Sequence, residues 1–286
     1  MNPIPRSVLA ALAAVFAAAV SPWPVSAQES AAAGETPAGR LAALEAEYEK
    51  AQKDFGALYE KAKTDEERQA LFEKHYPSPA AYVPRFIALA KEAPQDEAAA
   101  KALGWVLRYC REEPELTEAL DLLLEHHAER EALAAMCAPL RYSDVPRVET
   151  FLRTLLVESP SEEVRGQACY CLAHFLQRRA RFAESAKKLE ERAIRLPENA
   201  KYAGVDPAAD RAEAERLLER VVAEFGALAH YRGDLAAAAK GDLFEMRELA
   251  VGKPAPEIEG EDIDGVPFKL SDYRGKVIFL DFWGNW

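Results

Sequence analysis

Positive charge is in short supply in this sequence. Lysine and arginine total 36 against 48 aspartate and glutamate residues, which gives a formal net charge of -12. Nucleic acids and anionic membrane surfaces attract proteins through positive surface fields. The charge balance therefore argues against nucleic acid as a partner and against binding to a charged membrane surface.

Long apolar runs are also scarce. The run Val8–Val20 falls short of the about 20 residues that a membrane-spanning helix needs. It follows Arg6 and precedes small residues at 25–27, an arrangement typical of a secretory signal peptide over residues 1–27. We expect export to the periplasm or cell envelope, with no membrane span after signal cleavage. An uncleaved membrane anchor is the alternative.

Cysteine and histidine are few, and their spacing fits no metal site. The chain has 4 cysteines and 5 histidines, without an H-x-x-x-H or a paired C-x-x-C among them. It also lacks a glycine-rich phosphate loop and a G-x-S-x-G elbow. We therefore predict that the protein uses no metal and no other cofactor.

An exported protein can oxidise its cysteines, so their pairing has to be considered. Cys169 and Cys171 lie two positions apart on a predicted helix, where side chains point about 200° apart, so these two should not pair. A bridge between Cys110 and Cys137 is open, and so is a buried free thiol at each of the four positions.

Residues 28–39 are small and polar and are interrupted by glycine and proline, which predicts a flexible linker. After the linker, apolar side chains recur at spacings of three and four, which predicts a long amphipathic helix. Packing against neighbouring helices is favoured over a dimeric coiled coil. The apolar stripe consists of Leu41, Leu44, Tyr48, Ala51, Phe55, Leu58 and Ala62.

The same helical pattern continues and predicts an all-helical domain over residues 40–249. Prolines and N-cap residues separate the segments, and short connections make neighbouring helices antiparallel. Because no constant repeat period occurs, we predict a mainly α fold, an irregular α-solenoid of helical hairpins that binds a protein or peptide or acts as a spacer. The predicted helices cover residues 65–75, 79–93, 96–112, 115–127, 129–138, 144–158, 161–178, 181–195, 208–225 and 233–249.

The last part of the chain has a different, strand-like pattern. Asp264-Gly265 predicts a hairpin turn between strands within 257–263 and 266–270. Residues 277–283 are almost wholly apolar, which is typical of an inner strand in a sheet covered on both faces.

This part contains five short motifs in a fixed order: Val251-Gly252-Lys253-Pro254-Ala255-Pro256, Asp264-Gly265, Leu270-Ser271-Asp272, Gly275-Lys276-Val277 and Asp281-Phe282-Trp283-x-x-Trp286. Together they resemble the start of the redoxin branch of the thioredoxin superfamily. That branch includes the TlpA-like thiol-disulfide oxidoreductases and the AhpC/TSA peroxidases, and the final D-F-W-x-x-W is similar to the TlpA side, where a C-x-x-C follows. The resemblance implies a truncated α/β thioredoxin-like domain over 250–286, with a β-hairpin and one core strand.

The resemblance also implies roles for four residues. Asp281 matches a buried acid that accepts the proton of the resolving cysteine, and Phe282, Trp283 and Trp286 flank the cysteine pair. That pair would follow Trp286, so this chain should be redox-inactive alone. A solvated Asp281 and tryptophans that only pack in a core are the alternatives.

The resemblance thus implies that the parent protein is a periplasmic or envelope thiol-disulfide oxidoreductase acting on protein thiols and disulfides. A hairpin and one apolar strand cannot form a stable sheet alone, so we expect the bare strand to aggregate. We also expect the parent to continue for roughly a hundred residues, which would complete a domain of common size. The alternatives are a helical binding scaffold with a vestigial redoxin segment and an AhpC/TSA-type peroxidase.

Overall fold

The computed structural model describes residues 36–192, 194, 196–230, 233–250 and 252–281. The predicted signal peptide and most of the predicted linker lie outside these residues. None of the helices in the described ranges is long and apolar enough to cross a membrane.

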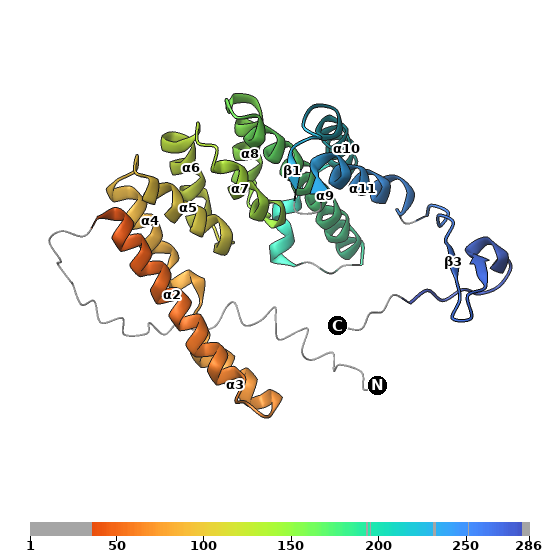
Figure 1. The fold of residues 1–286 in the computed structure, drawn as a ribbon, viewed down its shortest axis with the longest axis horizontal. Coiled ribbons are helices and arrows are strands. Elements are labelled where there is room, and N and C mark those ends of the chain that lie inside the picture. Colours follow the sequence, from red (N-terminus) through yellow and green to blue (C-terminus); the bar gives the residue numbers. More distant parts are fainter. Residues whose placement is uncertain (1–35, 193, 195, 231–232, 251, 282–286) are drawn as a thin grey trace. The chain divides into compact units, whose positions relative to one another are not determined.

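The described chain is mainly α-helical, as predicted, and short antiparallel ladders join β1 to β2 and β3 to β4 (Figure 1). The elements are α2 (Pro37–Tyr59), α3 (Asp65–His75), η2 (Pro79–Ala81), α4 (Val83–Glu92), α5 (Glu97–Tyr109), α6 (Glu115–His127), α7 (Leu133–Cys137), η3 (Ala138–Tyr142), α8 (Pro146–Glu158), α9 (Glu162–Glu191), η4 (Pro197–Tyr202), α10 (Pro207–Glu224), β1 (Ala229–His230), β2 (Gly233–Asp234), α11 (Leu235–Glu248), β3 (Glu259–Glu261), β4 (Pro267–Lys269) and η5 (Leu270–Tyr273).

Side-chain caps fix where many of these helices begin. Thr64 accepts a hydrogen bond from the N–H of Glu67 at 3.2 Å, and Asp96 accepts one from Ala98 at 2.7 Å. Asp234 caps α11 in the same way through Ala237 at 2.7 Å. Each cap satisfies an N–H that has no partner inside its helix, so the sequence signal and the observed start agree.

One predicted boundary is wrong. The helices predicted at 161–178 and 181–195 form the single helix α9, Glu162–Glu191. The sequence between them contains arginine and alanine, which favour helix, and neither proline nor glycine. Ala180 in that stretch is fully buried, so the apolar stripe of the helix continues through the predicted break.

Other helix ends shift by a few residues. Helix α2 begins at Pro37, inside the predicted linker, and the segment predicted at 129–138 contains a helix only over Leu133–Cys137. The helix predicted to reach residue 112 ends at Tyr109.

The ladder between β1 and β2 was not indicated by the sequence. It includes Gly233, whose φ of 118° few residues other than glycine adopt.

The helices share one apolar core. Buried residues of this cluster run from Leu41 on α2 to Leu243 on α11, and the largest fully buried side chains include Phe86, Phe151 and Phe175. Helices that follow one another in the chain pack together: α4 with α5, α5 with α6, α8 with α9, and α9 with α10. Packing between sequence neighbours is what helical hairpins predict.

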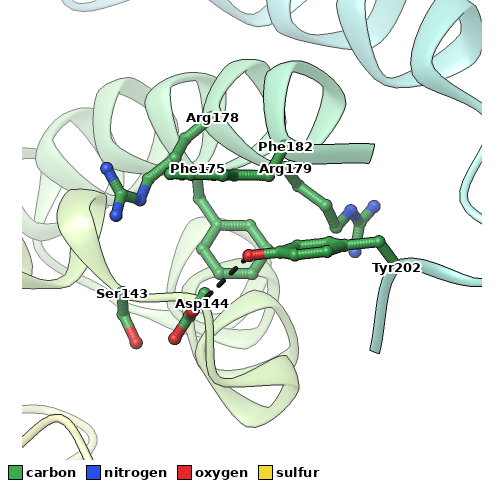
Figure 2. Close-up of a pocket in the computed structure, with 7 residues that line it drawn as sticks. All are labelled: Ser143, Asp144, Phe175, Arg178, Arg179, Phe182 and Tyr202. Carbon is green, nitrogen blue, oxygen red and sulfur yellow. Dashed lines mark hydrogen bonds between the residues drawn. The ribbon is translucent and has the colours of Figure 1, made fainter. Parts of the chain in front are cut away.

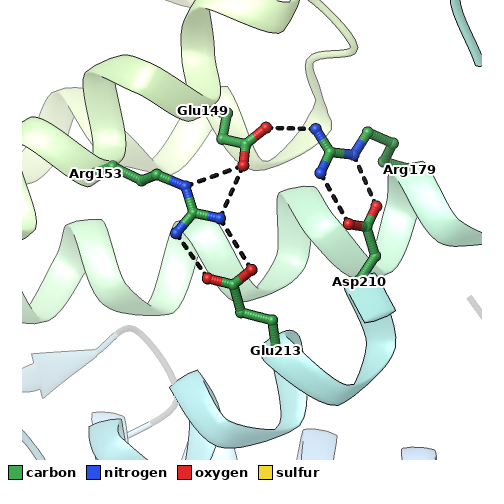
Figure 3. A network of polar contacts seen from close by, with 5 residues as sticks. All are labelled: Glu149, Arg153, Arg179, Asp210 and Glu213. Carbon is green, nitrogen blue, oxygen red and sulfur yellow. Dashed lines mark hydrogen bonds and ion pairs between the residues drawn. The ribbon is translucent and has the colours of Figure 1, made fainter. Parts of the chain in front are cut away.

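A network of charged side chains joins α8, α9 and α10 (Figure 3). Arg179 donates to both carboxylate oxygens of Asp210 at 2.7 and 2.8 Å, and Arg153 donates to both oxygens of Glu213 at 2.6 and 2.9 Å. Glu149 accepts from both arginines. The hydrogen bond from Arg153 lowers the pKa of Glu213, and the carboxylates raise the pKa of both arginines.

Candidate functional site

The terminal segment forms the predicted hairpin. Strands β3 and β4 pair antiparallel, with Gly260 opposite Phe268. Asp262 builds the turn, because its carboxylate accepts hydrogen bonds from the backbone N–H groups of Asp264 and Val266, both at 2.9 Å. Gly265 adopts a φ of 76°, so the Asp-Gly motif supplies the left-handed residue that this turn requires.

The next motif forms a short helical turn that is tied back to the hairpin. The Asp272 carboxylate accepts from the N–H of Lys269 at 3.0 Å, and the N–H of Ser271 donates to Glu257 at 2.9 Å. The bonds from Ser271 lower the pKa of Glu257. Gly275, with a φ of 84°, ends the turn. Three of the five motifs, those that contain Gly265, Asp272 and Gly275, therefore form local turns that set the chain direction before residue 277.

The strand predicted over 277–283 is not formed over residues 277–281. Val277 is 102% exposed and Phe279 is 89% exposed. A strand is stabilised by hydrogen bonds to its neighbours, and the hairpin does not pair with this segment. The apolar side chains of this segment therefore have no partner strand in the described part of the chain.

Asp281 lies at the end of this segment and is exposed. The role of Asp281 as a proton acceptor therefore stays a prediction. Phe282, Trp283 and Trp286, the predicted flanking residues, lie outside the described residues.

The cysteines of the chain all belong to the helical part, and all four are free and buried. The open bridge between Cys110 and Cys137 is therefore not formed, and Cys137 instead donates to the carbonyl of Leu133 at 3.3 Å. Burial raises the pKa of Cys169 and of Cys171 to about 12. Reactive cysteines need a lowered thiol pKa, so these residues are packing groups rather than redox groups.

The histidines do not form a metal site either. No group of three or more His, Cys, Asp or Glu residues in the described ranges could hold a metal ion. His174 lies 3.0 Å from the Asp242 carboxylate, and its ring meets the ring of Tyr170 edge-on at 4.6 Å. This contact ties α9 to α11, so it has a structural role.

A small pocket lies between η3, α9 and η4 (Figure 2). The aromatic rings and arginines leave a cavity of about 10 Å³, which holds at most a water molecule. It is too small for a substrate. Its lining consists of Ser143, Asp144, Phe175, Arg178, Arg179, Phe182 and Tyr202.

A much larger hollow, of about 790 Å³, lies between α2, α5 and the segment from α7 into η3. Trp105 and Tyr48 form part of its floor, and Arg108 stands on its rim. The sequence placed Tyr48 on an apolar stripe but did not single out the other two. Their only signal is that Trp105, Arg108 and Tyr109 recur at spacings of three and four on one helix, which does not reveal a hollow.

Short stretches of known proteins resemble this chain. Thiol-disulfide oxidoreductase ResA of Geobacillus thermodenitrificans is 48% identical over 42 residues, which cover 15% of this chain and 24% of that protein. The Geobacillus kaustophilus protein of the same name is 50% identical over 42 residues, with the same coverage. The Bacillus subtilis protein is 45% identical over 38 residues, covering 13% of this chain and 21% of its own length.

The chain spans about a quarter of the length of these curated relatives. No family model matches the chain, and no solved structure matches it. The similarity supports a relationship to thioredoxin-like oxidoreductases over this short stretch.

Proposed function

We propose that the whole protein is an exported thiol-disulfide oxidoreductase of the TlpA-like kind, with a helical domain that recruits or positions its partner. The observation that carries the proposal is the ordered motif set of the terminal segment, together with the similarity to ResA proteins over a stretch of comparable length. We infer that this stretch is the terminal segment, because the redoxin motifs lie there.

The geometry of the terminal segment supports this proposal. Its hairpin and turn are built by Asp262, Gly265 and Gly275, and they lead directly into the apolar segment that starts at Val277. In the longer protein, further strands would pair with residues 277–281 and would bury Asp281 beside the expected C-x-x-C. A buried carboxylate is suited to accept a proton near neutral pH.

The proposed chemistry is an exchange of two electrons between a dithiol and a disulfide. The first cysteine, as thiolate, attacks a sulfur of the substrate disulfide and releases the other substrate sulfur as a thiolate, which takes up a proton. The second cysteine loses its proton to Asp281 and attacks the mixed disulfide. The enzyme pair is then oxidised to a disulfide, and the substrate is reduced to two thiols.

The test is to express the reading frame through to its own stop codon and to measure reduction of insulin disulfides by the reduced protein. We expect insulin disulfides to be reduced in proportion to the reduced protein supplied, and we expect this reaction to be lost when the first cysteine of the C-x-x-C becomes serine. Asp281→Asn should slow resolution of the mixed disulfide and shift the pH profile of the rate. A frame without a downstream C-x-x-C, or a complete protein that reduces no disulfide, would refute the proposal.

A helical binding scaffold with a vestigial redoxin segment is the second candidate. The observation that favours it is the hollow between α2 and α5, which lies entirely within the helical part. If the protein is a scaffold, replacing both cysteines of the proposed C-x-x-C by serine should leave partner binding unchanged. The unmodified protein should then show no disulfide reduction.

A further inference from the structure

The hollow between α2, α5 and the α7–η3 segment is a groove of a size suited to a ligand. Its volume of about 790 Å³ lies within the range of about 300–1,000 Å³ that is typical of ligand sites. Helices form its walls, so its shape is set by elements rather than by loops. The lining residues are Glu45, Tyr48, Glu49, Gln52, Lys101, Gly104, Trp105, Arg108, Tyr109, Ala132, Ala135, Met136, Ala138 and Pro139.

The floor of the groove is a rigid set of aromatic rings. Tyr48 meets Trp105 edge-on at a centroid distance of 5.1 Å and meets Tyr109 at 5.4 Å. Phe86, which is fully buried, stacks on Trp105 at 4.0 Å and holds it in place. Tyr109 is 37% exposed, whereas Tyr48 and Trp105 are largely buried. Tyr109, with the accessible edge of Trp105, therefore offers apolar contact area to a ligand at a low ordering cost on binding.

Met136 makes one side of the floor adaptable. It lies over Gly104, where an added Cβ would come within 2.9 Å of the Met136 Cε atom. The missing side chain at Gly104 is what lets the thioether lie across the groove. Methionine fits apolar groups of different shapes, so this floor is suited to varied side chains rather than to a single small molecule.

The two long walls carry opposite charges. Glu45 and Glu49 come from α2, whereas Lys101 and Arg108 come from α5. Lys101 already pairs with Glu97 at 2.7 Å. The guanidinium of Arg108, by contrast, has no carboxylate within ion-pair distance in the described part of the chain.

Two arginines on other helices, Arg85 on α4 and Arg147 on α8, do have carboxylate partners. Arg85 holds both carboxylate oxygens of Glu47 at 2.7 and 2.8 Å, and Arg147 pairs with Asp121 at 2.6 Å. Walls of opposite sign repel part of any ligand whose charges all have one sign, such as a nucleic acid or an anionic lipid surface. They complement a polypeptide that carries both acidic and basic side chains.

We propose that this groove binds an extended segment of a client polypeptide, with a bulky apolar side chain against Trp105 and Met136 and an acidic side chain paired with Arg108. The inference rests on the proposed function in that it makes the helical domain the partner-binding module. It names the partner as an incompletely folded polypeptide, whose apolar side chains are exposed and whose backbone can lie extended between two helices.

The probe is a fluorescein-labelled octapeptide of serine and glycine with one central phenylalanine, a lysine before it and a glutamate after it. Binding to the chain is followed by fluorescence anisotropy. We expect saturable binding that weakens at least roughly tenfold when the peptide phenylalanine is replaced by serine, because a buried aromatic side chain is the main anchor of such contacts.

Two variants test the groove itself. Ala135→Trp fills it from an exposed lining position and should weaken binding by roughly tenfold or more. Ala237→Trp, at an exposed site on α11 outside the groove, is the matched control and should leave the affinity unchanged. Circular dichroism spectra and melting curves of both variants show whether either change disturbs the fold.

Charge reversal gives a test that does not depend on filling the groove. Arg108→Glu should weaken binding of the octapeptide by roughly threefold to fivefold, the size of an exposed ion pair. A peptide with lysine in place of its glutamate should bind Arg108→Glu more tightly than the original peptide does. The same peptide should not gain affinity for the unmodified chain.

Unchanged affinity in folded Ala135→Trp, absence of the charge rescue, or binding of a chitin-type oligosaccharide in preference to the peptide would each overturn the inference. The proposed redox function would survive these results, since it is tested by disulfide reduction in the longer protein. Conversely, peptide binding without any disulfide reduction would leave the groove assignment intact.

Discussion

The helical part and the terminal segment use similar apolar side chains with opposite results. Phe151 on α8 is fully buried, whereas Phe279 in the terminal segment is 89% exposed. A helix completes its backbone hydrogen bonds within itself and then needs only a packing partner, which the next helix supplies. A strand needs neighbouring strands for its backbone hydrogen bonds as well as for packing. It therefore forms only when those strands pair with it.

The polar contacts of the two regions differ in the same way. The network of Arg153, Arg179 and Asp210 joins residues 31 to 60 positions apart on three successive α-helices, while Asp262 and Asp272 bond backbone groups a few residues away. The helical part is therefore held by contacts between different helices, whereas these bonds in the terminal segment fix only the local direction of the chain.

The largest expected difference is in the effect of removing one phenylalanine from each region. Phe151→Ala should lower the free energy of unfolding by about 3–5 kcal/mol, because it leaves a cavity in the core. Phe279→Ala should leave it unchanged and should reduce aggregation. Urea unfolding followed by circular dichroism measures the first effect, and light scattering measures the second. Equal losses from both substitutions would contradict the comparison.

Thiol reactivity sharpens the same comparison. A thiol with a pKa of about 12, as burial gives Cys169 and Cys171, has roughly a thousandfold less thiolate at pH 8 than an ordinary cysteine. Native chain should therefore resist Ellman's reagent, and all 4 cysteines should react in urea. The C-x-x-C proposed for the longer protein should react in the native state. Rapid labelling of Cys171 in the folded chain would show that the helices open readily.

A smaller effect is expected in the pH dependence of stability, to which Glu213 of the helical part should contribute and Glu257 of the terminal segment should not. Hydrogen bonding to Arg153 places the folded-state pKa of Glu213 below its ordinary value of 4.5, so Glu213 stabilises the fold above pH 4.5. That contribution is lost as the pH falls through the lowered pKa. Glu213→Gln should cost about 1 kcal/mol at pH 7, and the difference from the unmodified chain should shrink below pH 4.

The control for this pH dependence is Glu257 of the terminal segment. The bonds from Ser271 also lower the pKa of Glu257, but this side chain does not contact the helical core. Glu257→Gln should therefore leave helix unfolding unchanged at every pH. Parallel pH curves for Glu213→Gln and the unmodified chain would show that the pair with Arg153 does not contribute.

The sequence predicted most where the signals are local. The bounds of α3 and α6 were correct because Thr64 and Pro114 mark their starts, and the hairpin was correct because Asp264-Gly265 defines its turn. The break expected after residue 178 does not occur. Arg179 lies inside α9, where it is held by Asp210 of α10, and this contact cannot be read from the local sequence.

The groove could not be predicted for a related reason. Tyr48 and Trp105 are far apart in the chain, and only the packing of α2 on α5 brings their rings together. The strand predicted over 277–283 is not formed over 277–281 for the opposite reason. Its apolar pattern suits a strand, but no strand in the described part of the chain pairs with it. The pattern of apolar side chains indicates a preference for helix or strand, but tertiary contacts determine whether that element forms.

The central claim is that the terminal segment is the front of a thioredoxin-like sheet. Hydrogen exchange of the backbone amides of residues 277–281, followed by mass spectrometry in the full reading frame and in this chain, tests it most directly. The account predicts exchange within seconds in this chain and protection for minutes to hours in the longer protein. Exchange within seconds in both proteins would contradict it.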